Sequence, residues 1–251
     1  MNSCRSNPKL EIRNISKSFD GELILNKVHL CLYPGEIISL LGVSGSGKST
    51  IFNIISGLLK PDDGKVLFNG EDITGMKGKV SYMLQKDLLL QHLPIVDNVA
   101  LPLFLKGMPK KEARQQAIKH FEKFGLKNME SSYPHELSGG MAQRAAFLRT
   151  YLFSKEVALL DEPFSALDAI TKSHIHSWYL DIMNEIKLST IFVTHDIDEA
   201  IKLSHRIYIL SSHPGEIVEE IPVNRQVMED EEYFLTKEYR MIKQKILQVL
   251  A

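Results

Sequence analysis

The stretch GVSGSGKST, residues 42–50, fits the pattern G-x-x-x-x-G-K-S and separates two segments of different hydrophobic pattern. The nearly all-apolar EIISLL before it (36–41) predicts a buried strand, and KSTIFNIISGLL after it has helical periodicity. A glycine-rich turn between a buried strand and a helix is the context that a phosphate-binding loop, or P-loop, requires. Backbone N–H groups of the turn and the helix N-terminus would bind phosphate oxygens. The stretch therefore predicts a nucleotide site in an α/β fold.

Two polar side chains of this loop have separate expected roles. Lys48 would reach the β- and γ-phosphates of a nucleoside triphosphate, and the hydroxyl of Ser49 would bind Mg²⁺. The nucleotide-binding residues predicted from the loop are Gly42, Ser44, Gly45, Gly47, Lys48, Ser49 and Thr50.

A second polar site is predicted at VALLDEP, where a buried strand ends in two acids. Ligands gather at the carboxyl ends of strands in open α/β sheets, so Asp161 is placed to bind Mg²⁺. Glu162 would act as general base for the attacking water or position it. An apolar run that ends in two acids is common at ordinary strand ends, and its interpretation here depends on the P-loop upstream.

The order of hydrophobic patterns predicts one domain with an insertion. Short strands surround the P-loop, the pattern is helical from 86 to about 155, and strand–helix alternation then resumes. We expect an α/β core (1–85 and 156–225) whose first and last parts share one sheet, a helical insert (86–155) and a C-terminal helix (226–251). On that last helix one apolar face would hold Leu235, Tyr239, Ile242, Ile246 and Leu250, packed on the core or on a partner.

Composition limits the other classes of function. The chain has 251 residues, 44% of them hydrophobic, and a net charge of −1, which gives no long-range attraction to nucleic acid. The two cysteines, Cys4 and Cys31, have the spacing of neither a disulfide framework nor a metal site, so we expect reduced thiols. No signal peptide and no run of about 20 apolar residues is present. These features predict a cytoplasmic chain that does not span the membrane.

A third motif is LSGGMAQR, residues 137–144, and it is the most specific of the three. With GVSGSGKST and LLDEPFSALD in this order, the chain resembles the ATP-binding cassette (ABC) family over roughly residues 9–220. The resemblance implies a P-loop ATPase with a mixed sheet, an antiparallel β edge and a helical subdomain that carries the signature motif. It also implies ATP and Mg²⁺, and a head-to-tail homodimer in which Ser138, Gly139 and Gly140 of one subunit cap the γ-phosphate bound by the other.

The resemblance assigns roles to further residues. Phe19 stands where the family stacks an aromatic ring on adenine, although its spacing also suits a core phenylalanine. Gln85 would touch Mg²⁺ or the attacking water, and His195 would contact the γ-phosphate as a switch histidine. Two other histidines, His174 and His176, are two apart on a predicted helix and cannot form a metal pair. The predicted catalytic residues are therefore Lys48, Gln85, Glu162 and His195, and the predicted metal ligands are Ser49, Gln85 and Asp161.

Three details are similar to one branch of bacterial importers. Met141 replaces the commoner glutamine after LSGG, and FSALD and SSHPGEI (211–217) are similar to segments in cassettes for nitrate, sulfonate, taurine and thiamine precursors. This likeness implies a peripheral ATPase on the cytoplasmic face of the membrane, with permease subunits bound around Gln85–Val99 and, indirectly, an extracytoplasmic solute-binding protein. It leaves the solute and the permease open. The alternatives are a soluble cassette ATPase of an assembly or repair system, and a nucleotide-binding regulator without turnover.

Overall fold

The computed structural model describes residues 7–154, 156–224 and 236–250. These residues form two compact units. The first, here called the P-loop unit, contains the described residues up to 80 and from 189 onward. The second, here called the signature unit, contains those from 81 to 188.

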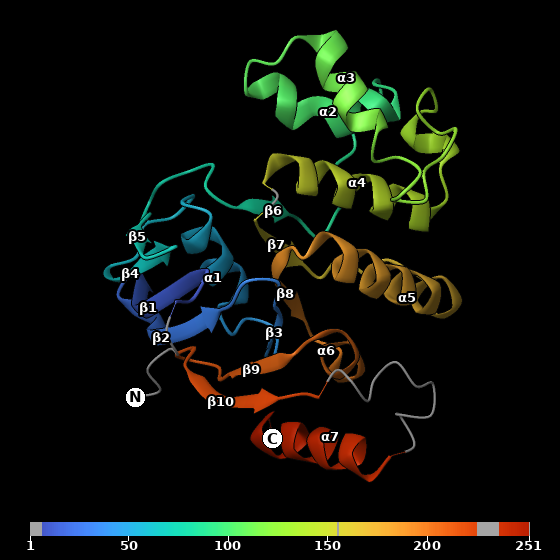
Figure 1. The fold of residues 1–251 in the computed structure, drawn as a ribbon. Coiled ribbons are helices and arrows are strands. Elements are labelled where there is room, and N and C mark those ends of the chain that lie inside the picture. The colour runs from blue at the N-terminus through green and yellow to red at the C-terminus, as the bar shows by residue number, and fades with distance from the viewer. Residues whose placement is uncertain (1–6, 155, 225–235, 251) are drawn as a thin grey trace. The chain divides into compact units, whose positions relative to one another are not determined.

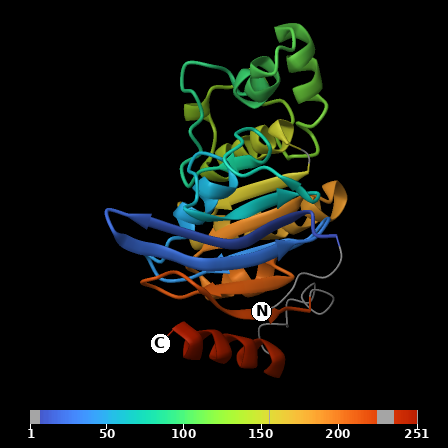
Figure 2. The same cartoon turned by 90° about the vertical axis from the view of Figure 1, so that its left-hand side faces the viewer.

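One sheet of the P-loop unit is antiparallel. It contains β1 (Leu10–Phe19), β2 (Glu22–Leu32), β4 (Asp63–Phe68) and β5 (Glu71–Asp72) in the order β2-β1-β4-β5. In β1 and β2 residues such as Leu10, Ile12, Val28 and Leu30 are buried, while Arg13 and Lys27 are exposed. Figure 2 shows β1 and β2 side by side in blue. This sheet is the predicted antiparallel edge.

The other sheet of this unit carries the P-loop. Its strands are β10 (Ile217–Pro222), β9 (Arg206–Leu210), β3 (Ile37–Leu41) and β8 (Ser189–Thr194), in that order. β3 is parallel to both β8 and β9, and β10 is antiparallel to β9. Every residue of β3 is buried, as its apolar run predicts. Segments about 150 positions apart in the chain therefore share one sheet, as expected.

Three helices complete the P-loop unit: α1 (Lys48–Ile55), α6 (Ile197–Leu203) and α7 (Lys237–Leu250). Tyr239 and Ile246 of α7 are buried in a cluster with Leu41, Ile201 and Ile221, so this helix packs on its own unit (Figures 1 and 2). Leu235, which we expected on the same face, lies outside the described residues. So does most of the range 226–236 that precedes the helix.

The signature unit is mainly helical. β6 (Ser81–Met83) and β7 (Val157–Asp161) form a parallel pair, and the helices are α2 (Ile95–Leu105), α3 (Lys110–Ile118), η1 (Pro134–Glu136), α4 (Gly139–Phe153) and α5 (Ala169–Ile186) (Figure 1). An aromatic cluster packs α4 against α5, with the rings of Phe147 and Trp178 5.9 Å apart between centroids.

Two expectations from the sequence are corrected here. Within the stretch from 86 to about 155, which we expected to be helical, α3 ends at Ile118, because turns over 119–125 bring Phe121 and Phe124 into the core. Cys31, in β2, is disulfide-bonded, so the expectation of a reduced thiol is wrong for this residue. No helix in the described part of the chain is long and apolar enough to cross a bilayer.

Candidate functional site

The P-loop connects β3 to α1 and is shaped by its glycines. Gly47 is the N-cap of α1 with φ of 96°, and a Cβ there would lie 2.6 Å from Cδ2 of buried Leu25. A Cβ on Gly42 would lie 2.9 Å from the Oγ of Ser46, which is itself buried. Gly45 has φ of 83° and faces open space. At Gly42 and Gly47 the loop therefore has no room for a side chain, whereas at Gly45 it is open. This leaves backbone N–H groups accessible to phosphate oxygens, as a phosphate-binding loop requires.

Lys48 is held across this loop. Its Nζ donates hydrogen bonds to the carbonyl oxygens of Gly42 (2.8 Å) and Val43 (2.7 Å), and the residue is 8% exposed. The loop thus fixes a positive charge at the point where it turns. Ser44 and Ser49 are exposed beside it, and Thr50 is half-buried.

The remaining predicted residues of the P-loop unit are exposed at strand ends. Phe19 ends β1 with 44% of its surface exposed, which excludes the core alternative, and Lys17 Nζ lies 5.4 Å from its ring centroid. His195 follows β8, whose residues are all buried, and its own side chain is exposed. Both side chains are exposed to solvent.

In the signature unit, Asp161 ends β7 and is bound by a residue that the sequence did not single out. The hydroxyl of Tyr82, on the neighbouring strand β6, donates to Asp161 Oδ2 at 3.3 Å. Burial, with the charge of Asp161 as the second cause, raises the pKa of Tyr82, so the phenol stays a donor. This bond fixes one carboxylate oxygen of Asp161.

Gln85 and Glu162 are brought together although they are 77 positions apart. Gln85 Nε2 donates to Glu162 Oε2 at 3.0 Å and to Ser165 Oγ at 3.4 Å. Glu162 has φ of 44°, and Ser165 Oγ donates to its carbonyl oxygen at 3.0 Å. The amide, the acid and the hydroxyl therefore form one polar cluster at the carboxyl ends of β6 and β7.

The signature motif forms the N-terminus of α4. Ser138 is the N-cap, and its Oγ accepts a hydrogen bond from Met141 N at 3.4 Å. Ser138 and Gly139 are exposed, Gly140 is buried, and the first turn of this 15-residue helix has no acidic residue. An exposed N-terminus without a local acid leaves the positive end of the helix dipole free for an anion.

The described residues contain no group of three His, Cys, Asp or Glu side chains that could hold a metal ion by itself. Proteins usually bind Mg²⁺ through one or two carboxylates together with substrate phosphates, and Asp161 at the end of β7 offers one carboxylate. His174 is exposed, whereas His176 is buried with its ring 4.7 Å from that of Phe164, so these two lie on different faces as predicted.

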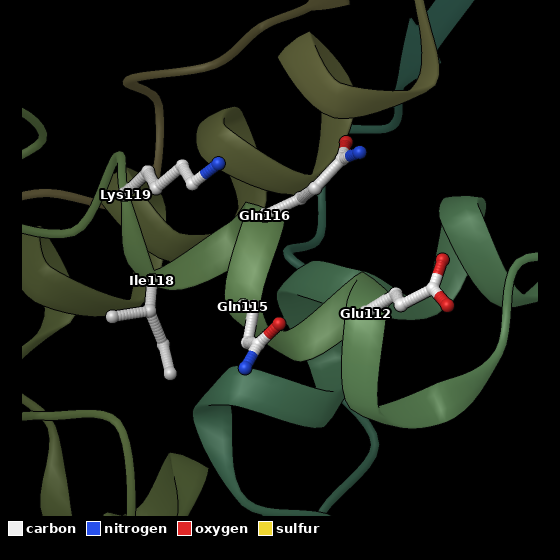
Figure 3. A pocket seen from close by; sticks show the side chains of 5 residues that line it. All are labelled: Glu112, Gln115, Gln116, Ile118 and Lys119. Atoms are coloured by element: carbon white, nitrogen blue, oxygen red, sulfur yellow. The ribbon is translucent and has the colours of Figure 1, made fainter.

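A hollow of 460 Å³ lies on the surface of α3. It is lined by Glu112, Gln115, Gln116, Ile118 and Lys119. Figure 3 shows these side chains spreading apart instead of meeting at one point. We assign no ligand to it.

Comparison with known proteins places these motifs in a family. The sequence profile of the ABC transporter family matches residues 25–165. The formylaminopyrimidine import ATP-binding protein ThiZ of Halalkalibacterium halodurans is 44% identical over 76% of this chain and 74% of its own length. The aliphatic sulfonates import ATP-binding protein SsuB of Bacillus thuringiensis is 37% identical over 95% of this chain and 94% of its own length.

A solved structure is similar as well. The dimeric post-hydrolysis state of the ATP-binding cassette MJ0796, bound to ADP and Pi, has a TM-score of 0.71 and 30% identity, covering 86% of this chain and 99% of that one. The chain belongs to the ABC transporter family. It has the ABC ATPase fold, ATP is its substrate, and the resemblance to the importer branch is confirmed.

Proposed function

We propose that this chain is the ATP-binding and ATP-hydrolysing subunit of a membrane importer for a small solute, acting at the cytoplasmic face of the membrane. The observation that carries the proposal is the set of P-loop and acidic groups described above, in a chain whose relatives are named as import ATP-binding proteins. Two copies would pair head to tail, so that the N-terminus of α4 in one copy meets the nucleotide on the P-loop of the other.

Each residue has a defined part in the reaction. Lys48 would balance charge on the β- and γ-phosphates, and Glu162 would orient the attacking water and accept its proton. His195 would contact the γ-phosphate, and Phe19 would stack on adenine. Ser49, Asp161 and Gln85 would hold Mg²⁺, which supplies charge neutralisation on the phosphate oxygens.

The Gln85–Glu162 hydrogen bond gives the acid two states. While Gln85 donates to Glu162, this hydrogen bond orients the carboxylate and engages one of its oxygens. If Gln85 turns to the metal, Glu162 is released to the water. Gln85 is exposed and Glu162 is half-buried, so the amide can turn without a change in the core.

Glu162→Gln tests the catalytic part of the proposal. The variant should lose hydrolysis while ATP-bound dimers accumulate, which is measured by phosphate release and by gel filtration with ATP. Glu112→Gln, an exposed acid on α3, is the matched control and should keep wild-type turnover. Unchanged turnover in Glu162→Gln would remove Glu162 from its role.

The permease contact is proposed for the loop that follows Gln85. This loop exposes Leu88 (52%) and Leu90 (36%), yet its backbone is held firmly from two helices. Buried Asn98 of α2 exchanges hydrogen bonds with the backbone of Leu90, and Arg149 of α4 donates to the carbonyl of Leu88 at 2.9 Å. An apolar surface on a fixed backbone suits the docking of a short helix.

The structure decides which leucines test this contact. Leu89 is 5% exposed, so a charge there would disturb the core, whereas Leu88→Glu and Leu90→Glu alter only the surface. These two changes together should abolish copurification with a membrane protein from native cells in gentle detergent. Leu105→Glu, at a leucine that is 77% exposed at the end of α2, should retain it.

The same purification separates the importer from a soluble cassette ATPase. A polytopic membrane protein in near-equal amount supports the importer, and soluble partners alone would overturn it. The associated solute-binding protein can then be screened against thiamine precursors, sulfonates, taurine and nitrate. We place a thiamine precursor first, because ThiZ has the higher identity of the two relatives described.

A further inference from the structure

The turn between β8 and α6 contains a buried acid whose presence needs a physical reason. The turn runs from Thr194 to Glu199 and exposes His195 at its second position. Thr194 is 2% exposed and Glu199 is 4% exposed. Burying a carboxylate costs free energy unless it is well hydrogen-bonded. An apolar side chain at this position would be buried at a lower free-energy cost.

Three hydrogen bonds join the turn into a closed ring around the backbone of His195. Asp196 N donates to Thr194 Oγ1 at 3.0 Å, Thr194 Oγ1 donates to Glu199 Oε2 at 2.6 Å, and Glu199 N donates to Asp196 Oδ1 at 3.2 Å. The first bond is a turn in which His195 is the central residue. The ring therefore fixes the direction in which the backbone presents His195, and no bond of the ring uses the imidazole.

Helix α7 also forms hydrogen bonds to this turn, through Asp198. The carboxylate of Asp198 accepts hydrogen bonds from the hydroxyl of Tyr239 and from Lys243 Nζ, the latter at 2.6 Å. Asp198 N in turn donates to Asp196 Oδ1 at 2.9 Å. The ring is thus anchored to a helix that packs on the same sheet.

We propose that Thr194 and Glu199 are positioning residues for His195: they hold the turn so that the imidazole meets the γ-phosphate, and they act on hydrolysis without touching the nucleotide. The inference rests on the role proposed above for His195. A displacement of about 1 Å in a reacting group can lower the rate on the order of 100-fold. The gain in rate from a fixed turn would therefore offset the free-energy cost of burying Glu199.

The test uses the full-length chain and changes one hydroxyl at a time. Thr194→Val removes both ring bonds of the hydroxyl at nearly constant volume, and Thr194→Ser keeps them. The matched control is Thr150→Val in α4, since Thr150 is also buried and its hydroxyl donates to Ala146 O at 2.8 Å. The two valine variants should lose similar stability in urea unfolding.

The expected result separates rate from binding. Thr194→Val should lower kcat on the order of 10- to 100-fold and change the ATP dissociation constant by less than about twofold. Thr194→Ser and Thr150→Val should keep kcat within about threefold of the wild type. A folded Thr194→Val with wild-type kcat, or an equal fall in Thr150→Val, would overturn the proposal.

The His195→Ala background shows whether the effect passes through the imidazole. There, Thr194→Val should cause no further fall in kcat, and a further fall of about tenfold would overturn the proposal. Wild-type turnover in His195→Ala alone would instead refute the role of His195 itself. If Thr194→Val does not fold, Glu199→Gln, which keeps an acceptor, should retain turnover, and Glu199→Met should lose it.

Discussion

The two glycines of positive φ in the P-loop differ in one feature that can be measured. Gly45 (φ 83°) faces open space, whereas a Cβ on Gly47 (φ 96°) would meet Leu25 Cδ2 at 2.6 Å. Replacement by alanine strains the backbone at both positions, by about 1–2 kcal/mol. It also removes conformational entropy from the unfolded chain in both cases, which offsets about 0.4–1 kcal/mol. These two effects cancel when the variants are compared.

The remaining difference is the contact with Leu25. This side chain is 0% exposed in β2 and cannot move aside without disturbing the core, so the contact should cost about 1–3 kcal/mol. Gly47→Ala should therefore have a free energy of unfolding lower than that of Gly45→Ala by this amount. Its ATP affinity should also fall, because the next residue is Lys48 and the start of α1 must shift.

Urea unfolding followed by circular dichroism and by tryptophan fluorescence is the suitable assay. The single tryptophan, Trp178, lies in the signature unit, so its fluorescence follows that unit while circular dichroism follows the whole chain. Gly21→Ala, at a turn glycine with φ of 85° and open space around it, reports strain alone outside the P-loop. Equal unfolding free energies for Gly47→Ala and Gly45→Ala, within about 0.5 kcal/mol, would refute the contact argument.

Two further predictions concern buried charges. Hydrogen bonds from Arg114 lower the pKa of Asp97, so the carboxylate contributes stability above its unfolded pKa of about 4 and loses it as pH falls through the lower folded value. Between pH 5 and 3, urea unfolding should therefore show a larger fall in the wild type than in Asp97→Asn, and equal falls would contradict this. Arg206 forms ion pairs with Glu36 (2.6 Å) and Glu220 (2.7 Å). Arg206→Met should lower the free energy of unfolding at pH 7 by about 2–4 kcal/mol, and Arg206→Lys should have a stability between those of the wild type and Arg206→Met. A loss below about 1 kcal/mol in Arg206→Met would show that water replaces the guanidinium.

The parts of the fold that the sequence predicted well are those with strong local signals. The strand 37–41 and the helix that begins at Lys48 lie as expected, because glycines mark both ends of the loop between them. The stop of α3 at Ile118 was missed, since three buried apolar residues in turns imitate helical spacing. In the run LLLQHLPIV no period separates buried Leu89 from exposed Leu88, so only tertiary contacts decide between them.

Some residues of the candidate site could also be predicted from the sequence, and others could not. The residues proposed to meet the nucleotide or the attacking water, such as Lys48 and Glu162, follow from motifs. The residues that support them do not: Tyr82 reaches Asp161 from another strand, and Glu199 has the sequence pattern of a solvent-exposed helix residue although it is buried. A motif records which groups touch the substrate, whereas support depends on packing that one sequence does not display.

The supporting residues share one arrangement, and it affects how the properties of variants are interpreted. Tyr82 holds Asp161, Thr194 and Glu199 hold the turn of His195, and Arg149 holds the loop proposed to bind the permease. His195 and Leu88 are exposed and Asp161 is half-buried, while the residues that support them are buried or half-buried. Since a supporting residue acts on geometry and makes no contact with ATP, its loss should lower turnover or coupling while nucleotide affinity stays close to normal. Variants of that kind, in the described parts of both units, mark supporting residues and should not be taken as evidence of a second nucleotide site.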